Sequence, residues 1–71
     1  MTCGIYKIEN MVNKKCYIGQ SINIEKRWKQ HIRMLNNHSH HSQKLQNSWA
    51  KYGGKYFNFS IIEICEKEYL N

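Results

Sequence analysis

The hydrophobic and polar positions at the start of the chain follow the pattern of two neighbouring β-strands. Residues 3–9 (CGIYKIE) and 16–20 (CYIGQ) are rich in residues that favour strands. The segment between them contains Asn10 and Asn13, which suit a turn. We therefore predict a β-hairpin at this end of the chain.

Side chains alternate between the two faces of a strand, so the hairpin sorts its residues into two sets. Tyr6 shares a face with Gly4 on the first strand, and Tyr17 shares a face with Gly19 and Lys15 on the second. Both tyrosines can therefore point to a common side of the predicted sheet.

Residues 24–36 are predicted to form an amphipathic helix. Apolar side chains recur at helical spacing, at Ile24, Trp28, Ile32 and Leu35. Asn23 and Ser21 are the candidate N-caps. His31 falls inside the apolar stripe, and three basic side chains occupy the opposite face: Lys26, Lys29 and Arg33.

A second helix and a third strand complete the pattern. After a polar loop at residues 36–42, helical spacing returns and then stops at a glycine pair suited to a C-cap, residues 53–54; the apolar positions are Leu45, Trp49 and Tyr52. Residues 56–65 read as a strand, and residues 66–71 as the start of a further helix. The order β-β-α-α-β predicts one α+β domain over residues 1–71, a small three-stranded antiparallel sheet flanked by helices.

Charge and composition favour a polyanionic partner. Eleven lysines and arginines against five acidic residues give a net charge of +6, an excess that attracts nucleic acid. Three cysteines without a C-x-x-C pair fit neither a disulfide framework nor a zinc knuckle. No stretch approaches the roughly 18 apolar residues of a membrane span, and no signal peptide is evident. We expect a soluble, intracellular protein with no membrane partner.

Two tripeptides of the hairpin resemble the signature of a known family. GIY at residues 4–6 and YIG at residues 17–19 are separated by ten residues, which resembles the paired motif of the GIY-YIG nuclease superfamily. Arg27 and His31, in EKRWKQH, and His40, in a stretch resembling HS-x-KLQ-x-S, match residues of its homing-endonuclease branch, the intron-encoded or phage type. The resemblance covers nearly the whole chain.

The resemblance implies a domain that hydrolyses a DNA phosphodiester bond with one divalent cation, Mg²⁺ or Mn²⁺, and a water nucleophile. Such chemistry needs a base for the water, a Lewis acid on the phosphate and donors for the developing charge. The resemblance also implies a separate DNA-binding region in the full-length protein. The sequence leaves the oligomeric state, the DNA target and the activity of this chain alone open.

The resemblance also implies the roles of five side chains. Tyr6 corresponds to the general base, and its phenol, with an ordinary pKa of about 10, must be acidified to act as one. Tyr17 would support the water or the scissile phosphate. Arg27 would bind a phosphate oxygen, and His31, one turn on, would hydrogen-bond a tyrosine or the phosphate. His40 corresponds to a further active-site histidine.

Other residues near these positions have simpler interpretations. Gly4 and Gly19 are expected to act through the backbone, because the absence of side chains permits close approach around the tyrosines. Lys15 is either a cation that acidifies a tyrosine or an ordinary turn lysine. His38 and His41 are expected to be loop residues. A purely structural alternative remains for each tyrosine, since sheet tyrosines often bury the ring and keep the hydroxyl wet.

The carboxylate for the cation is the part of the site that the resemblance places outside the chain. The family holds its cation with a glutamate on the helix after the third strand. We therefore expect the metal ligand beyond Asn71 and a C-terminally incomplete domain. The carboxylates available in its place are Glu63, Glu66 and Glu68.

Two other functions compete with the endonuclease. A catalytically silent nucleic-acid-binding module on the same fold would use its basic faces on phosphate. A zinc protein built on the histidine loop at residues 38–41 would need a further ligand, and no cysteine lies near. The sequence favours a metal-dependent DNA endonuclease domain, with the silent module as the alternative.

Overall fold

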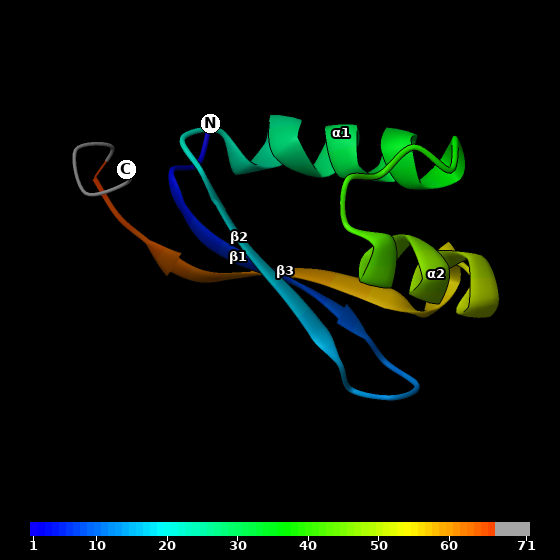
Figure 1. The fold of residues 1–71 in the computed structure, drawn as a ribbon. Coiled ribbons are helices and arrows are strands. Elements are labelled where there is room, and N and C mark those ends of the chain that lie inside the picture. The colour runs from blue at the N-terminus through cyan, green and yellow to red at the C-terminus, as the bar shows by residue number, and fades with distance from the viewer. Residues whose placement is uncertain (67–71) are drawn as a thin grey trace.

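A computed structural model describes residues 1–66, which form a three-stranded antiparallel sheet and two α-helices (Figure 1). The elements in chain order are β1 (Gly4–Asn10), β2 (Cys16–Ser21), α1 (Ile24–Asn36), α2 (Gln43–Tyr52), the 3-10 turn η1 (Gly54–Tyr56) and β3 (Phe57–Ile64). The predicted α+β fold and element order are confirmed. The predicted start of a further helix falls on residues 66–71 and, apart from Glu66, lies outside the described residues.

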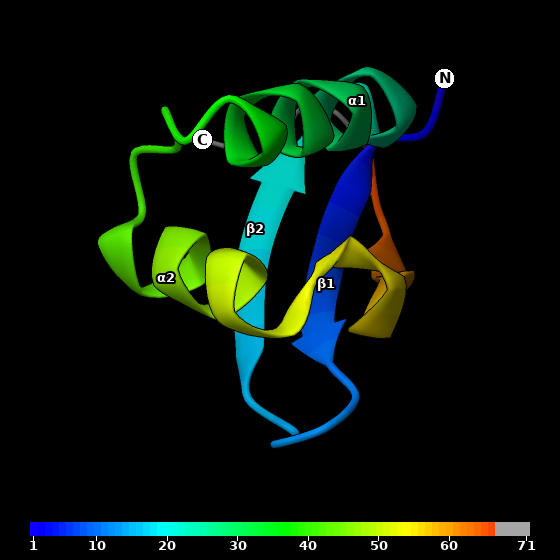
Figure 2. The ribbon, with the colours of Figure 1, turned by 90° about the vertical axis from the view of Figure 1, so that its right-hand side faces the viewer.

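The central strand of the sheet is β1, which pairs antiparallel with β2 on one side and β3 on the other. In the β1–β2 register Tyr6 lies opposite Gly19 and Ile8 lies opposite Tyr17, so the two tyrosines share a face of the sheet, as predicted. Alternate residues of β1 are buried, starting at Gly4. Both helices lie on the same side of the sheet (Figures 1 and 2), and this side holds the core.

Local hydrogen bonds set the ends of both helices. Asn23 is the N-cap of α1, and its side chain accepts from the backbone N–H of Lys26 at 3.2 Å. Ser21, the other candidate, instead accepts from the N–H of Asn23 at 3.0 Å. Ser42 caps α2, which ends at Gly53 with φ of 89°, a left-handed conformation that glycine adopts without steric cost.

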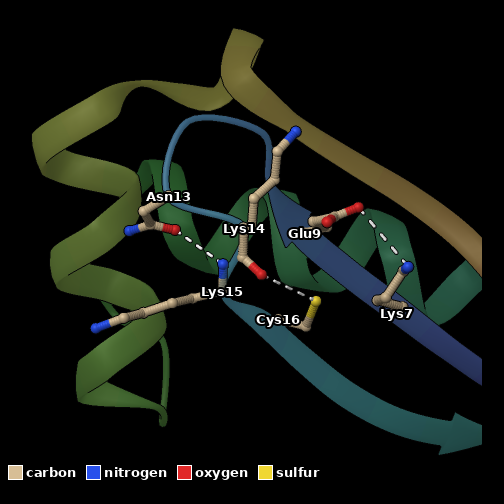
Figure 3. Close-up of polar contacts among 6 residues, drawn as sticks. All are labelled: Lys7, Glu9, Asn13, Lys14, Lys15 and Cys16. Atoms are coloured by element: carbon tan, nitrogen blue, oxygen red, sulfur yellow. Dashed lines mark hydrogen bonds and ion pairs between the residues drawn. The ribbon is translucent and has the colours of Figure 1, made fainter.

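Hydrogen bonds close the hairpin turn between β1 and β2, and Figure 3 shows the one between Asn13 and Lys15. The N–H of Asn10 donates to the carbonyl of Lys15 at 3.0 Å, and the side chain of Asn13 accepts from the N–H of Lys15, also at 3.0 Å. Lys14 takes a positive φ of 65°. Asparagine side chains support such turns by bonding the backbone two residues on, which is the role the sequence predicts for this segment.

The core lies between the sheet and the two helices, and one prediction about it is wrong. Its buried apolar side chains come from β1, α1 and α2: Tyr6, Ile8, Ile24, Leu35 and Leu45. Ile32, predicted in the apolar stripe of α1, is 39% exposed, whereas His31 is fully buried. At about 100° per residue Ile32 lies on the edge of the stripe and His31 near its centre, so the rotation of α1 buries the histidine.

No helix within residues 1–66 is both long and apolar enough to cross a lipid bilayer.

Candidate active site

The Tyr6 side chain crosses from β1 toward α1, beneath Gly19 of β2. A Cβ built at Gly19 would lie 2.5 Å from Cζ of Tyr6 and would overlap the hydroxyl. Gly19 therefore leaves the space that the phenol ring occupies. Gly4 makes room for a different neighbour, because a Cβ there would overlap the carbonyl group of Glu63 on β3. The ring of Tyr6 is buried, with 1% of its surface exposed.

A chain of short hydrogen bonds joins Tyr6 to two histidines. The hydroxyl of Tyr6 lies 2.6 Å from Nε2 of His31, and Nδ1 of His31 lies 2.6 Å from Nε2 of His40. The backbone N–H of Ser42 donates to Nδ1 of His40 at 2.9 Å. This series of hydrogen bonds therefore connects β1, α1 and the loop between the helices.

The backbone N–H at one end of this hydrogen-bond series determines which atom donates in each bond. Because the N–H of Ser42 can only donate, Nδ1 of His40 accepts, and a neutral His40 has its proton on Nε2. That proton is donated to Nδ1 of His31, which leaves the N–H of His31 at Nε2. His31 then donates to the hydroxyl of Tyr6. A neutral pair of histidines is therefore a hydrogen-bond donor to the tyrosine.

The surroundings keep both histidines neutral near pH 7. The pKa of His31 is lowered to about 4, mainly by burial and in smaller part by the nearby His40, Arg27 and His41. Burial also lowers the pKa of His40, assisted by His41. The neutral forms that the hydrogen bonds require are thus the forms that the site favours.

Tyr6 experiences two opposing effects. Burial raises the pKa of its phenol above the ordinary value, while a hydrogen bond from Arg27 and the charge of that guanidinium lower it. Burial is the larger effect, so the net shift is upward. The residues around Tyr6 therefore hold it as a neutral phenol, and only additional positive charge would acidify it.

Tyr17 contacts the same histidines from β2 and binds a residue that the sequence did not single out. Its hydroxyl lies 3.1 Å from Nε2 of His41. The ring of Tyr17 packs edge-on against His31, at 5.5 Å between centroids. His41, expected to be a loop residue, thus belongs to the site, whereas His38 is an exposed loop residue with φ of 55°.

The three imidazoles form one stack, which we call the histidine stack: His31, His40 and His41. Centroids of His31 and His40 lie 4.9 Å apart and those of His40 and His41 lie 4.3 Å apart, with 23° between the planes in each pair. The adjacent histidines in HSHH are the signal in the sequence for this contact, although the sequence gives no reason to expect both of them to face the sheet.

Gln46 is a second residue that sequence reasoning missed. Its side-chain oxygen accepts from the backbone N–H of His40 at 3.1 Å, and its amide donates to the carbonyl of Leu35 at 3.0 Å. Gln46 is buried and therefore fixes the loop that contains His40 to the end of α1 and to α2. The place of Gln46 in the KLQ stretch, directly after the core position Leu45, was the available clue.

Arg27 and Lys15 lie at the margins of the site. Arg27 is half-buried on α1, lies near Tyr6 and donates to the side chain of Gln30 at 3.3 Å. Arg27 also lines a surface cavity of about 460 Å³. Lys15 is exposed and lines a second hollow together with Tyr17.

The described residues alone do not fit a metal ion. Within residues 1–66, no group of three or more histidine, cysteine, aspartate or glutamate side chains is arranged to hold one. Both ring nitrogens of His31 and of His40, and Nε2 of His41, are engaged with each other, with Tyr6 and Tyr17, or with the backbone. Glu63 and Glu66 are exposed, and Glu68 lies outside the described residues. A zinc site in the histidine loop is not formed by this part of the chain.

Comparisons with known proteins agree with this fold and with the motif that forms the site. A family model described as the GIY-YIG catalytic domain matches residues 2–70. The protein "Intron-associated endonuclease 1" of Enterobacteria phage T4 is 46% identical over 63 residues, which is 89% of this chain and 25% of that protein. This chain therefore spans a quarter of the length of that relative.

Two solved structures share the fold. The catalytic domain of homing endonuclease I-TevI matches with a TM-score of 0.85 and 43% identity, over 93% of this chain and 73% of that one. A variant of the same catalytic domain matches with a TM-score of 0.87 and 44% identity, over 96% of this chain and 71% of that one.

Proposed function

Because the chain belongs to the GIY-YIG catalytic domain family, we propose that residues 1–71 belong to the catalytic domain of a DNA endonuclease that hydrolyses phosphodiester bonds. The observation that supports this best is the directed hydrogen-bond chain from His40 through His31 to Tyr6, with Arg27 beside the phenol. A structural tyrosine needs one partner for its hydroxyl. Tyr6 has, beyond its bond to His31, the positive charge of Arg27 nearby, and both favour a phenolate.

In the proposed reaction Tyr6 acts as a phenolate: its own proton is first released to solvent, and the phenolate oxygen then accepts a proton from the attacking water. His31 donates to the Tyr6 oxygen and has no free lone pair at Nε2, so it cannot take the phenol proton. Its role is to stabilise the phenolate by a hydrogen bond, while His40 holds His31 in the required tautomer. Arg27 presents planar donors to a phosphate oxygen as negative charge develops. Tyr17 is held by His41 and faces the same side of the sheet.

A divalent cation, Mg²⁺ or Mn²⁺, is part of the proposal. Its ligands are not assigned to the described residues, which do not fit it by themselves. The upward shift of the Tyr6 pKa supports the need for additional positive charge beside the phenol.

DNA is the proposed substrate, and a separate DNA-binding region and an intracellular location are also proposed. The length of the phage relative, of which this chain covers 25%, supports the separate region.

Two substitutions in the full-length protein test the assignment. Tyr6→Phe and Arg27→Ala should each reduce plasmid nicking in Mg²⁺ by on the order of 10²-fold or more, because each removes a group acting on the reacting atoms. Circular dichroism should show an intact fold. Tyr56→Phe is a matched control, since it removes the same hydroxyl from an exposed tyrosine in η1 and should cut normally.

The outcomes separate the competing functions. If Tyr6→Phe and Arg27→Ala both cleave plasmid at the wild-type rate, the site is wrongly assigned. Wild-type protein that binds DNA in a salt-sensitive way and never cuts it, with Mg²⁺ or Mn²⁺ present, would establish the silent binding module instead.

A further inference from the structure

The hollow that Lys15 and Tyr17 line is a groove of about 830 Å³ between the hairpin and α2. Its floor is apolar and is formed by Ile8, Leu45 and Phe57. Tyr17 and Ser42 line it as well, and both also contact the histidine stack. The groove therefore begins next to the candidate active site.

One wall of the groove is a polar face of α2. Lys44, Asn47, Ser48 and Lys51 line it at positions i, i+3, i+4 and i+7, a spacing that places four side chains on one face of a helix. The two lysines are two turns apart, which is about 10.5 Å along the helix axis. Leu45 and Gln46 are the buried residues of α2 and face the protein.

The hairpin forms the opposite wall, and Lys15 lines it there. Figure 3 shows the Lys15 side chain extended toward α2, on the other side of the turn from Lys7 and Glu9. The turn is closed by the hydrogen bond from the N–H of Lys15 to Asn13, so the backbone that presents this lysine is fixed. Lysines thus approach the groove from both walls.

Acidic side chains are missing from this surface. None of the described residues that line the groove is acidic. The sequence contains no aspartate or glutamate between Glu25 and Glu63, and therefore none on α2. Glu9, the glutamate nearest to the turn in sequence, pairs with Lys7 at 3.7 Å. The charged side chains that line the groove are all lysines, so its electrostatic field is positive.

We propose that this groove binds the sugar-phosphate backbone of one DNA strand, next to the phosphate that the active site would cleave. The proposal rests on the proposed endonuclease function. The two lysines, about 10.5 Å apart along α2, are far enough apart to contact different phosphates of one strand. Asn47 and Ser48, which lie between the lysines, offer neutral hydrogen-bond donors to the phosphates in the middle. The bound DNA strand would reach the candidate active site at Tyr17, which lines the groove and contacts the histidine stack.

The salt dependence of DNA binding tests this proposal. The groove variant is Lys15→Gln, Lys44→Gln and Lys51→Gln combined. The control variant also removes three positive charges, at exposed positions that do not line the groove. It combines Lys29→Gln, Arg33→Gln and Lys55→Gln. All six side chains are exposed, so both variants should fold. Binding of each full-length protein to a labelled DNA duplex is followed by fluorescence anisotropy at rising NaCl concentrations.

Each phosphate contact contributes about 0.9 to the slope of log K against log salt concentration. We expect the magnitude of the slope to be smaller than in the wild-type protein by roughly 2 to 3 in the groove variant and by less than about 1 in the control variant. Equal slopes for the two variants would overturn the proposal.

The groove and the endonuclease function can fail separately. If the wild-type protein nicks plasmid and the two variants show equal slopes, the groove proposal is wrong and the nuclease assignment stands. If the wild-type protein never nicks DNA and only the groove variant loses slope, the groove binds a strand backbone and the nuclease assignment is wrong.

Discussion

At the scale of single residues, the position of the Tyr6 phenol depends on Gly19 across the hairpin. The two residues lie directly opposite each other in the β1–β2 register. The glycine of one tripeptide therefore makes room for the tyrosine of the other. The arrangement is not symmetric, because Tyr17 lies opposite Ile8 and Gly4 faces the backbone of β3.

Substitution of Gly19 by alanine should displace Tyr6. The added Cβ would overlap the phenol hydroxyl, so the ring must move and its hydrogen bond to His31 should lengthen or break. We expect a loss of about 1–3 kcal/mol in the free energy of unfolding, typical of an overpacked interior. Urea denaturation measures this loss, and plasmid nicking should fall in parallel.

Gly53→Ala is the control for this substitution. It is strained by the positive φ of 89° at a position where a Cβ meets no neighbour, so it should cost stability without disturbing the site. A Gly19→Ala protein that nicks DNA as well as Gly53→Ala would contradict the role of Gly19.

At the scale of elements, α1 determines where two of the site residues lie. Arg27 and His31 are one turn apart on this helix, and both approach Tyr6. The start of α1 is set by Asn23 and by Thr2, whose carbonyl accepts from the N–H of Ile24 at 2.8 Å. The start of the helix is therefore anchored by both its cap and the N-terminal segment.

Removal of the α1 cap should weaken the fold by a predictable amount. Asn23→Ala leaves the N–H of Lys26 without its side-chain acceptor and should cost about 1 kcal/mol, measured by urea denaturation. Asn23→Asp keeps an acceptor at the same position and should stay close to the wild-type stability. If the alanine and aspartate variants prove equally stable, the side-chain cap does not determine where α1 begins.

At the scale of the whole molecule, His31 connects the sheet to both helices. It bonds β1 through Tyr6 and the inter-helix loop through His40, while Gln46 ties that loop to α2. Because the fold holds the pKa of His31 at about 4, protonation of this residue opposes folding. The stability of the molecule should therefore depend on pH.

The sign of this dependence follows from the two pKa values. An unfolded histidine has a pKa of about 6.5, so between about pH 6.5 and 4 the unfolded chain binds the extra proton. The contribution of His31, on the order of 3 kcal/mol, is complete above about pH 6.5 and lost as the pH falls to about 4. Urea denaturation at a series of pH values measures it.

Two histidine substitutions identify the residue responsible. His31→Gln cannot titrate and should reduce the slope in this pH range to the part that His40 contributes, while His38→Gln, at an exposed position, should keep the wild-type dependence. The same slope in wild type and His31→Gln would assign the effect to other groups.

Most of the elements could be predicted because their signals are local. Alternation at Gly4 and Tyr6, the Asn23 cap and the glycine at position 53 depend on neighbours within one or two turns of chain. The prediction for Ile32 was wrong, since the rotation of α1 about its axis is decided by the sheet beneath it.

The order of strands and helices can be predicted from the amino-acid sequence, because periodicity and capping depend on residues close together in the chain, and the paired tripeptides indicate the family. The contacts of His41 with Tyr17 and of Gln46 with His40, and the position of Lys15 across the groove from α2, follow from the folded arrangement. These contacts join residues from different elements, and Lys15 is far in sequence from α2. Such contacts form only when the helices pack on the sheet and exclude water from the space between them.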